Sequence, residues 1–225
     1  MSVPLSPPPS RRYLSLWLRR LATDRLARSR SPAPDEPVVV TEAVKSAQRI
    51  VAMNDAAQRL GLRHGMPLAD ARAMFPALVV AAGDAAADRR LLDAVADWCD
   101  RYTPLIGLDA PDGLMLDITG CAHLFGGELA LCRDLLARLA AQHLHARAAI
   151  ADTAGCAWGV AHHGDASLVP PRQMRAALAP LPAAALRLAP ETVAALAEVG
   201  LREVGDLLDL PRAPLAARFG DILVR

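Results

Sequence analysis

The sequence predicts an α+β fold in which an antiparallel or mixed sheet carries helices on one face. Two observations lead to this class. Short apolar runs alternate with longer stretches at helical spacing, in the order strand, helix, hairpin, helix, strand, helix. The composition, 53% hydrophobic and 22% charged, is that of a globular chain, and 225 residues can bury a sizeable core.

The N-terminal part is predicted to begin with a strand. Residues 1–10 are rich in proline and are predicted to be a disordered lead-in, whereas residues 13–18, YLSLWL, are apolar and aromatic and predict a buried strand. The run VVV at 38–40 predicts a second strand. Residues 46–60 have helical spacing and predict a helix that ends at Gly61, and Met66-Pro67 opens the next helix.

The middle of the chain supplies the hairpin and its helices. Residues 88–102 predict a helix with one apolar face, formed by Leu91, Leu92, Val95, Trp98 and Cys99. PLIGL and LMLDIT follow as paired strands, joined by Ala110-Pro111-Asp112-Gly113, which has the chemistry of a tight turn. A helix is predicted at 127–143, a buried strand at 147–151 and another helix at 154–163.

The C-terminal part is predicted to be helical. LVPPRQM is typical of a linker, and the residues after it predict short helices punctuated by Gly200, Gly205 and Pro211. The chain stops after the apolar DILV, so we expect it to be a fragment.

Charge and cysteine usage narrow the class of protein. A formal net charge of +1 excludes a uniformly basic nucleic-acid coat, so such binding requires a local patch. The candidates for a surface that binds DNA or an acidic partner are Arg19, Arg20, Arg25, Arg28 and Arg30, and the alternative is a solvated face. The cysteines show no C-x-x-C spacing, which favours free thiols and a cytoplasmic location, and no apolar run predicts a membrane span.

Other polar and aromatic residues carry weaker signals. His143 and His145 are two residues apart but are predicted to end a helix, and His162 and His163 have no acidic or cysteine companions, so the sequence predicts no metal site at these histidines. Trp98 and Trp158 are predicted to be core residues rather than base-stacking platforms.

Three stretches, in this order, resemble the Y-family translesion DNA polymerases across residues 12–220. GLRHGMPLADARAMFP is similar to that family's fingers, DRYTPLIGLDAPDGLMLDITG to its palm hairpin, and LAEVGLREVGDLLDLP to its helix-hairpin-helix thumb. RRYLSLWLRRLATDRL and PDGLMLDITGCAHLFGG resemble the ImuB-type members in particular. The resemblance implies a first palm strand at 11–20, small fingers at 21–83, palm at 84–166, and a linker with an incomplete helical thumb at 167–225.

The resemblance also implies where catalytic metals would bind. Two-metal phosphoryl transfer requires several converging carboxylates, because Mg²⁺ prefers hard oxygen ligands. Ser15 matches the family's first aspartate, and Trp17 lies where a second aspartate is usual. Asp112 matches the hairpin aspartate, although turn formation explains it completely and is favoured over a ligand role, and Gly113 replaces the glutamate. These positions are therefore interpreted as vestigial, and Mg²⁺ is expected only for an active polymerase; Asp109 would supply a ligand only after a register slip.

The nucleotide pocket is expected to be degenerate as well. The positions that match the triphosphate-gripping tyrosine, arginine and lysine are Asp55, Gln58 and Ala154. A carboxylate where phosphate should bind, with two cations removed, makes binding repulsive.

The thumb departs from the family pattern too. A helix-hairpin-helix holds DNA phosphate through the backbone at glycines, but Arg187 and Ala189 stand at those positions, and Glu191 stands where lysine is common. We therefore expect DNA binding to be weak.

These departures lead to the hypothesis of a non-catalytic scaffold in DNA-damage-induced mutagenesis, translesion synthesis and the SOS response. The resemblance implies three partners: an error-prone replicative-type DNA polymerase, a RecA-like accessory subunit and the sliding clamp. The alternatives are an active or residual error-prone DNA polymerase and a plain DNA-binding module.

Overall fold

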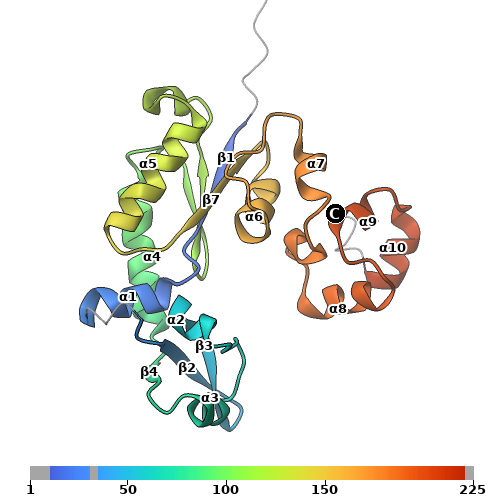
Figure 1. Ribbon diagram of the computed structural model, residues 1–225. Helices are drawn as coiled ribbons and strands as arrows, with labels where there is room; N and C mark the ends of the chain where they lie inside the picture. Colours follow the sequence, from blue (N-terminus) through green and yellow to red (C-terminus); the bar gives the residue numbers. More distant parts are fainter. Residues whose placement is uncertain (1–10, 31–34, 221–225) are drawn as a thin grey trace, which may run out of the picture.

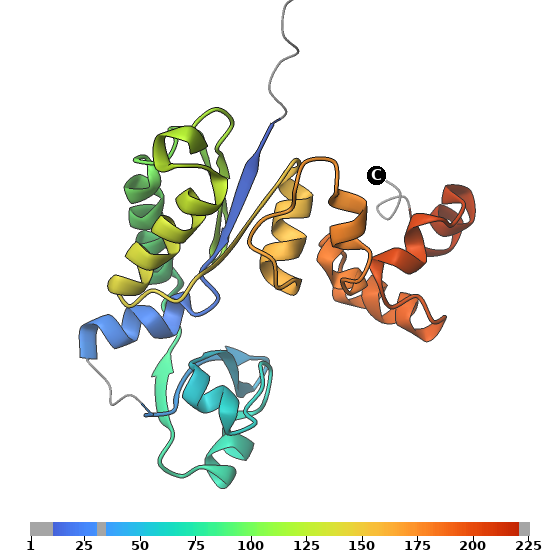
Figure 2. The same ribbon diagram turned by 45° about the horizontal axis from the view of Figure 1, so that its top comes forward.

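The computed structural model describes residues 11–30 and 35–220 (Figure 1). The predicted disordered lead-in, residues 1–10, lies outside the described residues. Figure 2 shows three parts: a sheet with its helices, a second small sheet next to α1, and a helical C-terminal part beside α6.

The central sheet is antiparallel throughout. It contains β1 (Tyr13–Trp17), β5 (Ile106–Asp109), β6 (Gly113–Asp117) and β7 (Arg147–Ala151), in the order β5-β6-β1-β7. The side chains of β1 alternate, so Leu14 and Leu16 enter one core while Ser15 belongs to the opposite face. The predicted strands at 13–18 and 147–151 and the predicted hairpin are confirmed.

Helices cover both faces of this sheet. α4 (Ala85–Cys99) and α5 (Glu128–Ala141) pack against the face of Leu14 and Leu16, with the short 3₁₀ helix η1 (Ala122–Phe125) leading into α5. α6 (Ala154–His163) packs against the other face, because Ala149 and Ala151 leave a shallow apolar surface there. β7, the predicted RAAIA strand, is therefore covered on both sides. The sequence predicted helices on only one face of the sheet, and α6 is the addition on the other face.

The second sheet is mixed. β2 (Val38–Val44) pairs antiparallel with β3 (Ala47–Met53) and parallel with β4 (Val79–Ala82). α1 (Leu21–Arg30), α2 (Asp55–Arg59) and α3 (Leu68–Met74) accompany it. Leu21 packs in the core of the central sheet, although the predicted fingers segment begins at residue 21.

The predicted helix over 46–60 is wrong for most of its length. Only 55–59 is helical, whereas 47–53 forms β3 after a tight turn at Lys45-Ser46, with Lys45 at φ 55°. Pairing with β2 overrides the helical spacing, and the spacing that buries Ile50 also suits a strand. Gly61 follows α2 and Pro67 caps α3, as predicted. β4 was not expected from the sequence.

The C-terminal part consists of short helices. They are α7 (Met174–Leu178), η2 (Ala183–Leu186), α8 (Pro190–Glu198), α9 (Val204–Leu208) and α10 (Arg212–Phe219). Gly200, at φ 86°, follows α8, and Pro211 caps α10, as predicted. Gly205 is different: it lies inside α9, and a Cβ there would stand 3.0 Å from the Ala179 carbonyl oxygen. Close packing, not a helix break, explains this glycine.

Candidate functional site

Ser15 cannot take the place of a metal-binding aspartate. It lies in the middle of β1, opposite Met115 of β6 and Ala149 of β7, and is 1% exposed. Its Oγ is buried and has no hydrogen-bond partner within the described residues. A neutral hydroxyl enclosed in this way supplies neither the charge nor the access that a divalent cation needs.

Asp112 is held by its neighbours at the tip of the β5–β6 hairpin. Its backbone carbonyl accepts a hydrogen bond of 2.8 Å from the N–H of Leu18, and its Oδ2 accepts one of 3.0 Å from Trp17 Nε1. Burial raises the pKa of the Asp112 carboxyl, and the hydrogen bond from Trp17 opposes that rise. Asp112 is thus a turn residue, as expected, whose carboxylate already has a neutral donor.

Gly113 is tightly packed at the position where the Y-family polymerases that the sequence resembles carry a glutamate. It pairs with Trp17 across the sheet, and a Cβ at this position would lie 3.0 Å from the carbonyl oxygen and 3.3 Å from Cβ of Asp109. Over residues 11–30 and 35–220, no group of three or more histidine, cysteine, aspartate or glutamate side chains could hold a metal ion. The residues present therefore do not fit a two-metal centre.

An aromatic stack occupies the neighbouring surface. The His162 ring lies 4.4 Å from the Trp17 ring and 4.0 Å from the Trp158 ring, at interplanar angles of 22° and 21°. Two indoles cannot share one imidazole face at these distances, so His162 is sandwiched between them. Burial lowers the pKa of His162 to about 4, so the ring is neutral at pH 7. Trp158 is thus part of this stack rather than the plain core residue that was predicted.

Arg187 extends the stack to the hairpin. Its guanidinium carbon lies 4.7 Å from the Trp158 ring centre, and a terminal nitrogen forms an ion pair with Asp109. The backbone of Arg187 is left-handed, with φ 59°, which is the conformation expected of the glycine it replaces. The hairpin acids thus have separate partners: Asp109 pairs with Arg187, and Asp112 with Trp17.

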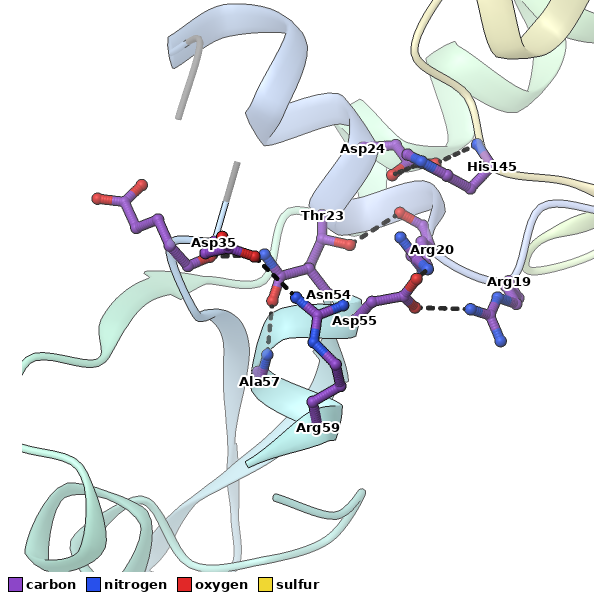
Figure 3. Close-up of polar contacts among 11 residues, drawn as sticks. Arg19, Arg20, Thr23, Asp24, Asp35, Asn54, Asp55, Ala57, Arg59 and His145 are labelled. Carbon is purple, nitrogen blue, oxygen red and sulfur yellow. Dashed lines mark hydrogen bonds and ion pairs between the residues drawn. The ribbon is translucent and has the colours of Figure 1, made fainter. Parts of the chain in front are cut away.

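The expected nucleotide position at Asp55 is occupied by ion pairs within the protein. Asp55 opens α2 and binds Arg19 at 2.6 Å and also Arg20, both from the segment between β1 and α1 (Figure 3). These pairs tie the second sheet to the central one. Asp55 therefore engages two arginines that could otherwise attract phosphate, and its single negative charge offsets part of their positive charge.

Gln58 borders a cleft of about 800 Å³ between the two sheets, and Trp17 and Asp112 also line it. Ala154 is not part of this group. β7 runs antiparallel to β1 and places Ala151 opposite Tyr13, so Ala154 lies near the start of β1, whereas Asp55 lies past its end. Ala154, which was matched to a triphosphate-gripping position, does not line this cleft, whereas His162 in the last turn of α6 stacks on Trp17 at its border.

The arginine cluster is largely engaged inside the protein. Arg20 is 8% exposed, Arg25 pairs with Asp88 at 2.6 Å, and Arg28 donates to the carbonyl oxygen of Gln142 at 2.7 Å. Arg30 is exposed. Arg25 and Arg28 thus hold α1 to α4 and to the residues after α5. These arginines have structural contacts inside the protein and are not simply exposed for a binding partner.

A second cavity, of about 510 Å³, is lined by α1, α2 and the residues before β7, and Arg20 and Asp55 are part of its lining. Asp24, 4% exposed, also lines it and accepts hydrogen bonds from the backbone N–H of His145 at 2.6 Å and from its ring at 2.9 Å (Figure 3). Burial raises the pKa of Asp24 while both bonds from His145 oppose the rise. Asp24 thus ties α1 to the residues that precede β7.

The site residues not anticipated from the sequence are Trp158 and His162 as a stacked pair. They lie four residues apart on α6, a spacing that puts side chains one above the other on a helix, so this signal was present in the sequence. The pairing of Arg187 with Asp109 spans 78 residues and had no local signal.

Comparison with known proteins gives consistent results. Residues 26–161 match the impB/mucB/samB family. The chain is 53% identical over 162 residues to Protein ImuB of Caulobacter vibrioides (strain NA1000 / CB15N), covering 72% of this chain and 35% of that protein. It is 30% identical over 163 residues to DNA polymerase IV 2 of Mesorhizobium japonicum, covering 70% of this chain and 39% of that protein. The chain thus spans well under half the length of these curated relatives.

Solved structures share the fold. DinB from Sulfolobus solfataricus aligns with a TM-score of 0.77 at 16% identity, over 93% of this chain and 63% of that one. The insertion ternary complex of Dbh DNA polymerase aligns with a TM-score of 0.78 at 15% identity, over the same shares. The fold is that of Y-family polymerases. No helix among the described residues has the length and hydropathy needed to cross a membrane.

Proposed function

The chain belongs to the impB/mucB/samB family, and on that premise we propose that its polymerase-like body is a non-catalytic scaffold in DNA-damage-induced mutagenesis and translesion synthesis. The observation that carries the proposal is the state of the three metal positions. Ser15 is neutral and buried, Asp112 is bonded to Trp17, and Gly113 has no side chain. At these three positions two divalent ions would meet one carboxylate, and the neighbouring Asp109 is already paired with Arg187, which leaves too little free negative charge to hold them.

A scaffold of this kind acts through partner proteins. From the similarity to Protein ImuB of Caulobacter vibrioides, the proposed partners are an error-prone replicative-type polymerase, a RecA-like accessory subunit and the sliding clamp, working in the cytoplasm as part of the SOS response. The internal pairing of Arg19, Arg20 and Arg25 supports a minor role for DNA, because paired arginines attract phosphate weakly.

Primer extension tests the absence of catalysis. The full chain is incubated with primer-template and nucleotides in Mg²⁺ and, separately, in Mn²⁺, beside an active Y-family polymerase as positive control. We expect no templated incorporation above the level of a no-protein control. Incorporation that disappears in Asp112→Ala would overturn the proposal.

That outcome would support the second candidate, an error-prone polymerase with an altered metal site. The similarity to DNA polymerase IV 2 of Mesorhizobium japonicum supports this second candidate. Matched samples of the parent and of Asp109→Ala would then show which hairpin carboxylate serves the metal.

A further inference from the structure

We propose that Arg187 latches the C-terminal helices onto the β5–β6 hairpin, beside the cleft that Trp17 and Asp112 line. The latch consists of Asp109, Arg187, Trp158, His162 and Trp17, in order of contact. This inference goes beyond the proposed function, because an inactive scaffold could equally have an open, mobile thumb.

The latch joins parts that are distant in sequence. Arg187 follows η2, Trp158 and His162 belong to α6, Trp17 ends β1, and Asp109 ends β5. Each contact in this chain crosses from one element to the next, except that between Trp158 and His162 on α6. The C-terminal part is thereby connected to the edge strand β5 and to the middle strand β1 of the central sheet.

Close backbone packing holds Arg187 in position. A Cβ at Gly159 of α6 would lie 3.0 Å from the carbonyl oxygen of Ala185 and 3.2 Å from Cδ2 of Leu178. The absence of a side chain at Gly159 therefore lets η2 sit directly on α6, and Ala185 is buried there at 2% exposure. Arg187 caps η2 and donates its backbone N–H to Ala184, so its side chain starts from a fixed point.

The charges of the hairpin favour the closed state. The Asp109 side chain is 16% exposed and lies close enough to Asp112 to raise the pKa of the latter by like-charge repulsion. The guanidinium of Arg187 offsets this negative charge, and its other contact is the indole face of Trp158, which attracts cations. Opening the latch would leave Asp109 half-buried without its cation.

The latch and a metal site exclude each other. Any ion bound at the hairpin would compete with Arg187 for Asp109 and with Trp17 for Asp112. The substitutions in β1 and at the η2–α8 turn thus act together: one removes metal ligands, and the other gives Asp109 a cation from the protein itself.

Hydrogen exchange on the full chain tests the latch through Arg187→Gly, which keeps the left-handed backbone and removes the side chain. Arg172→Gly is the matched control, because Arg172 is also left-handed, at φ 65°, and exposed. We expect exchange in peptides covering 105–113 and 183–188 to become at least tenfold faster in Arg187→Gly and to stay unchanged in Arg172→Gly. Equal exchange in both variants would overturn the proposal.

Two further measurements keep the test decisive. Asp109→Asn must reproduce the faster exchange, and the double variant with Arg187→Gly must add little to either single variant; full additivity would contradict a shared contact. In a Trp98→Phe background Trp17 and Trp158 are the only tryptophans, and we expect acrylamide to quench the tryptophan fluorescence at least twice as efficiently after Arg187→Gly. If Arg187→Gly does not fold, Arg187→Lys and Asp109→Asn carry the comparison. None of these readouts depends on polymerase activity, so they stand apart from primer extension.

Discussion

The indole Nε1 of Trp17 donates a hydrogen bond of 3.0 Å to Oδ2 of Asp112. Trp17 stands where active relatives are expected to have an aspartate, and Asp112 stands at the hairpin position that matches a metal ligand. Trp17 on β1 therefore donates a hydrogen bond to the carboxylate that remains on the hairpin. An aspartate at position 17 would repel Asp112, whereas the neutral indole N–H pairs with it, and one hydrogen-bonded charge costs less in a partly buried place than two uncompensated charges.

Asp112→Asn is expected to stabilise the protein at pH 7, by roughly 0.5 kcal/mol. Burial raises the pKa of Asp112, so its contribution to stability is fully present below the unfolded-state pKa and is lost as pH rises through the folded-state pKa. Asparagine removes this loss and still offers an oxygen to Trp17. Urea unfolding at pH 7 and pH 3 measures the difference; a variant that is less stable at pH 7 would contradict the assignment.

Ser15→Asp is expected to destabilise rather than to restore a metal site. Ser15 is 1% exposed between Met115 and Ala149, so an ionised carboxylate there has no partner and costs about 3 kcal/mol or more in the free energy of unfolding. Ser15→Ala is the matched control and should be neutral or slightly stabilising, because the Oγ is unsatisfied within the described residues. A Ser15→Asp protein that gains stability on addition of Mg²⁺ would show that the position can still bind metal.

His162→Phe is expected to remove a pH dependence of stability. The pKa of His162 is lowered from 6.5 to about 4, chiefly by burial, so its contribution is present above the unfolded-state pKa of 6.5 and is lost as pH falls toward about 4. Phenylalanine keeps the stack with Trp17 and Trp158 without a titratable group. Thermal unfolding between pH 7 and pH 4 should show a shallower decline for the variant than for the parent, and parallel curves would argue against a sandwiched neutral ring.

The elements that the sequence predicts correctly are those whose local pattern and tertiary role agree. Residues 147–151 and 154–163 are an apolar strand and a helix with a Thr153 cap, and both limits agree with the structure. The helix prediction was wrong for residues 47–53 because a helix and a strand would both bury Ile50. Only pairing with the neighbouring strand β2 decides between the two. Distant pairing of this kind is invisible in a local window.

The candidate site divides in the same way. Trp17, Asp112 and Gly113 lie together because the register of β1 against β6 puts Trp17 opposite Gly113, whereas Ser15 lies opposite Met115. Ala154 does not join Asp55, because the direction of α6 depends on how β7 pairs with β1. Arg187 could be recognised as a departure from glycine, but its ion pair with Asp109 depends on the packing of η2 against α6.

Asp55→Ala is expected to loosen the connection between the two sheets. It leaves Arg20, whose side chain is 10% exposed, without its carboxylate, and the Asp55 side chain is itself 40% exposed, so solvent screening limits the loss to about 1 kcal/mol. Asp35→Ala is the control, because it breaks an ion pair between two exposed side chains, Arg59 at 62% and Asp35 at 91%. We expect it to change stability little. Urea unfolding at low and high salt compares them, and equal effects would show that the Asp55 pairs have no special role.

Binding to primer-template DNA is expected to be weak and only shallowly dependent on salt. A strong non-specific binder neutralises several phosphates, and each released counterion adds about one unit to the slope of log affinity against log salt. Here Arg19 and Arg20 are paired with Asp55, and Arg25 with Asp88, so few cations of the cluster are available. Fluorescence anisotropy with labelled primer-template at two salt concentrations measures both the affinity and its salt dependence.

Asp55→Ala frees two arginines at once and should bind DNA more tightly than the parent, whereas Asp35→Ala, which frees one exposed arginine, should change affinity less. Sub-micromolar affinity of the parent with a steep salt slope would instead support a DNA-binding module, because it would require a phosphate-binding surface that does not depend on the paired arginines.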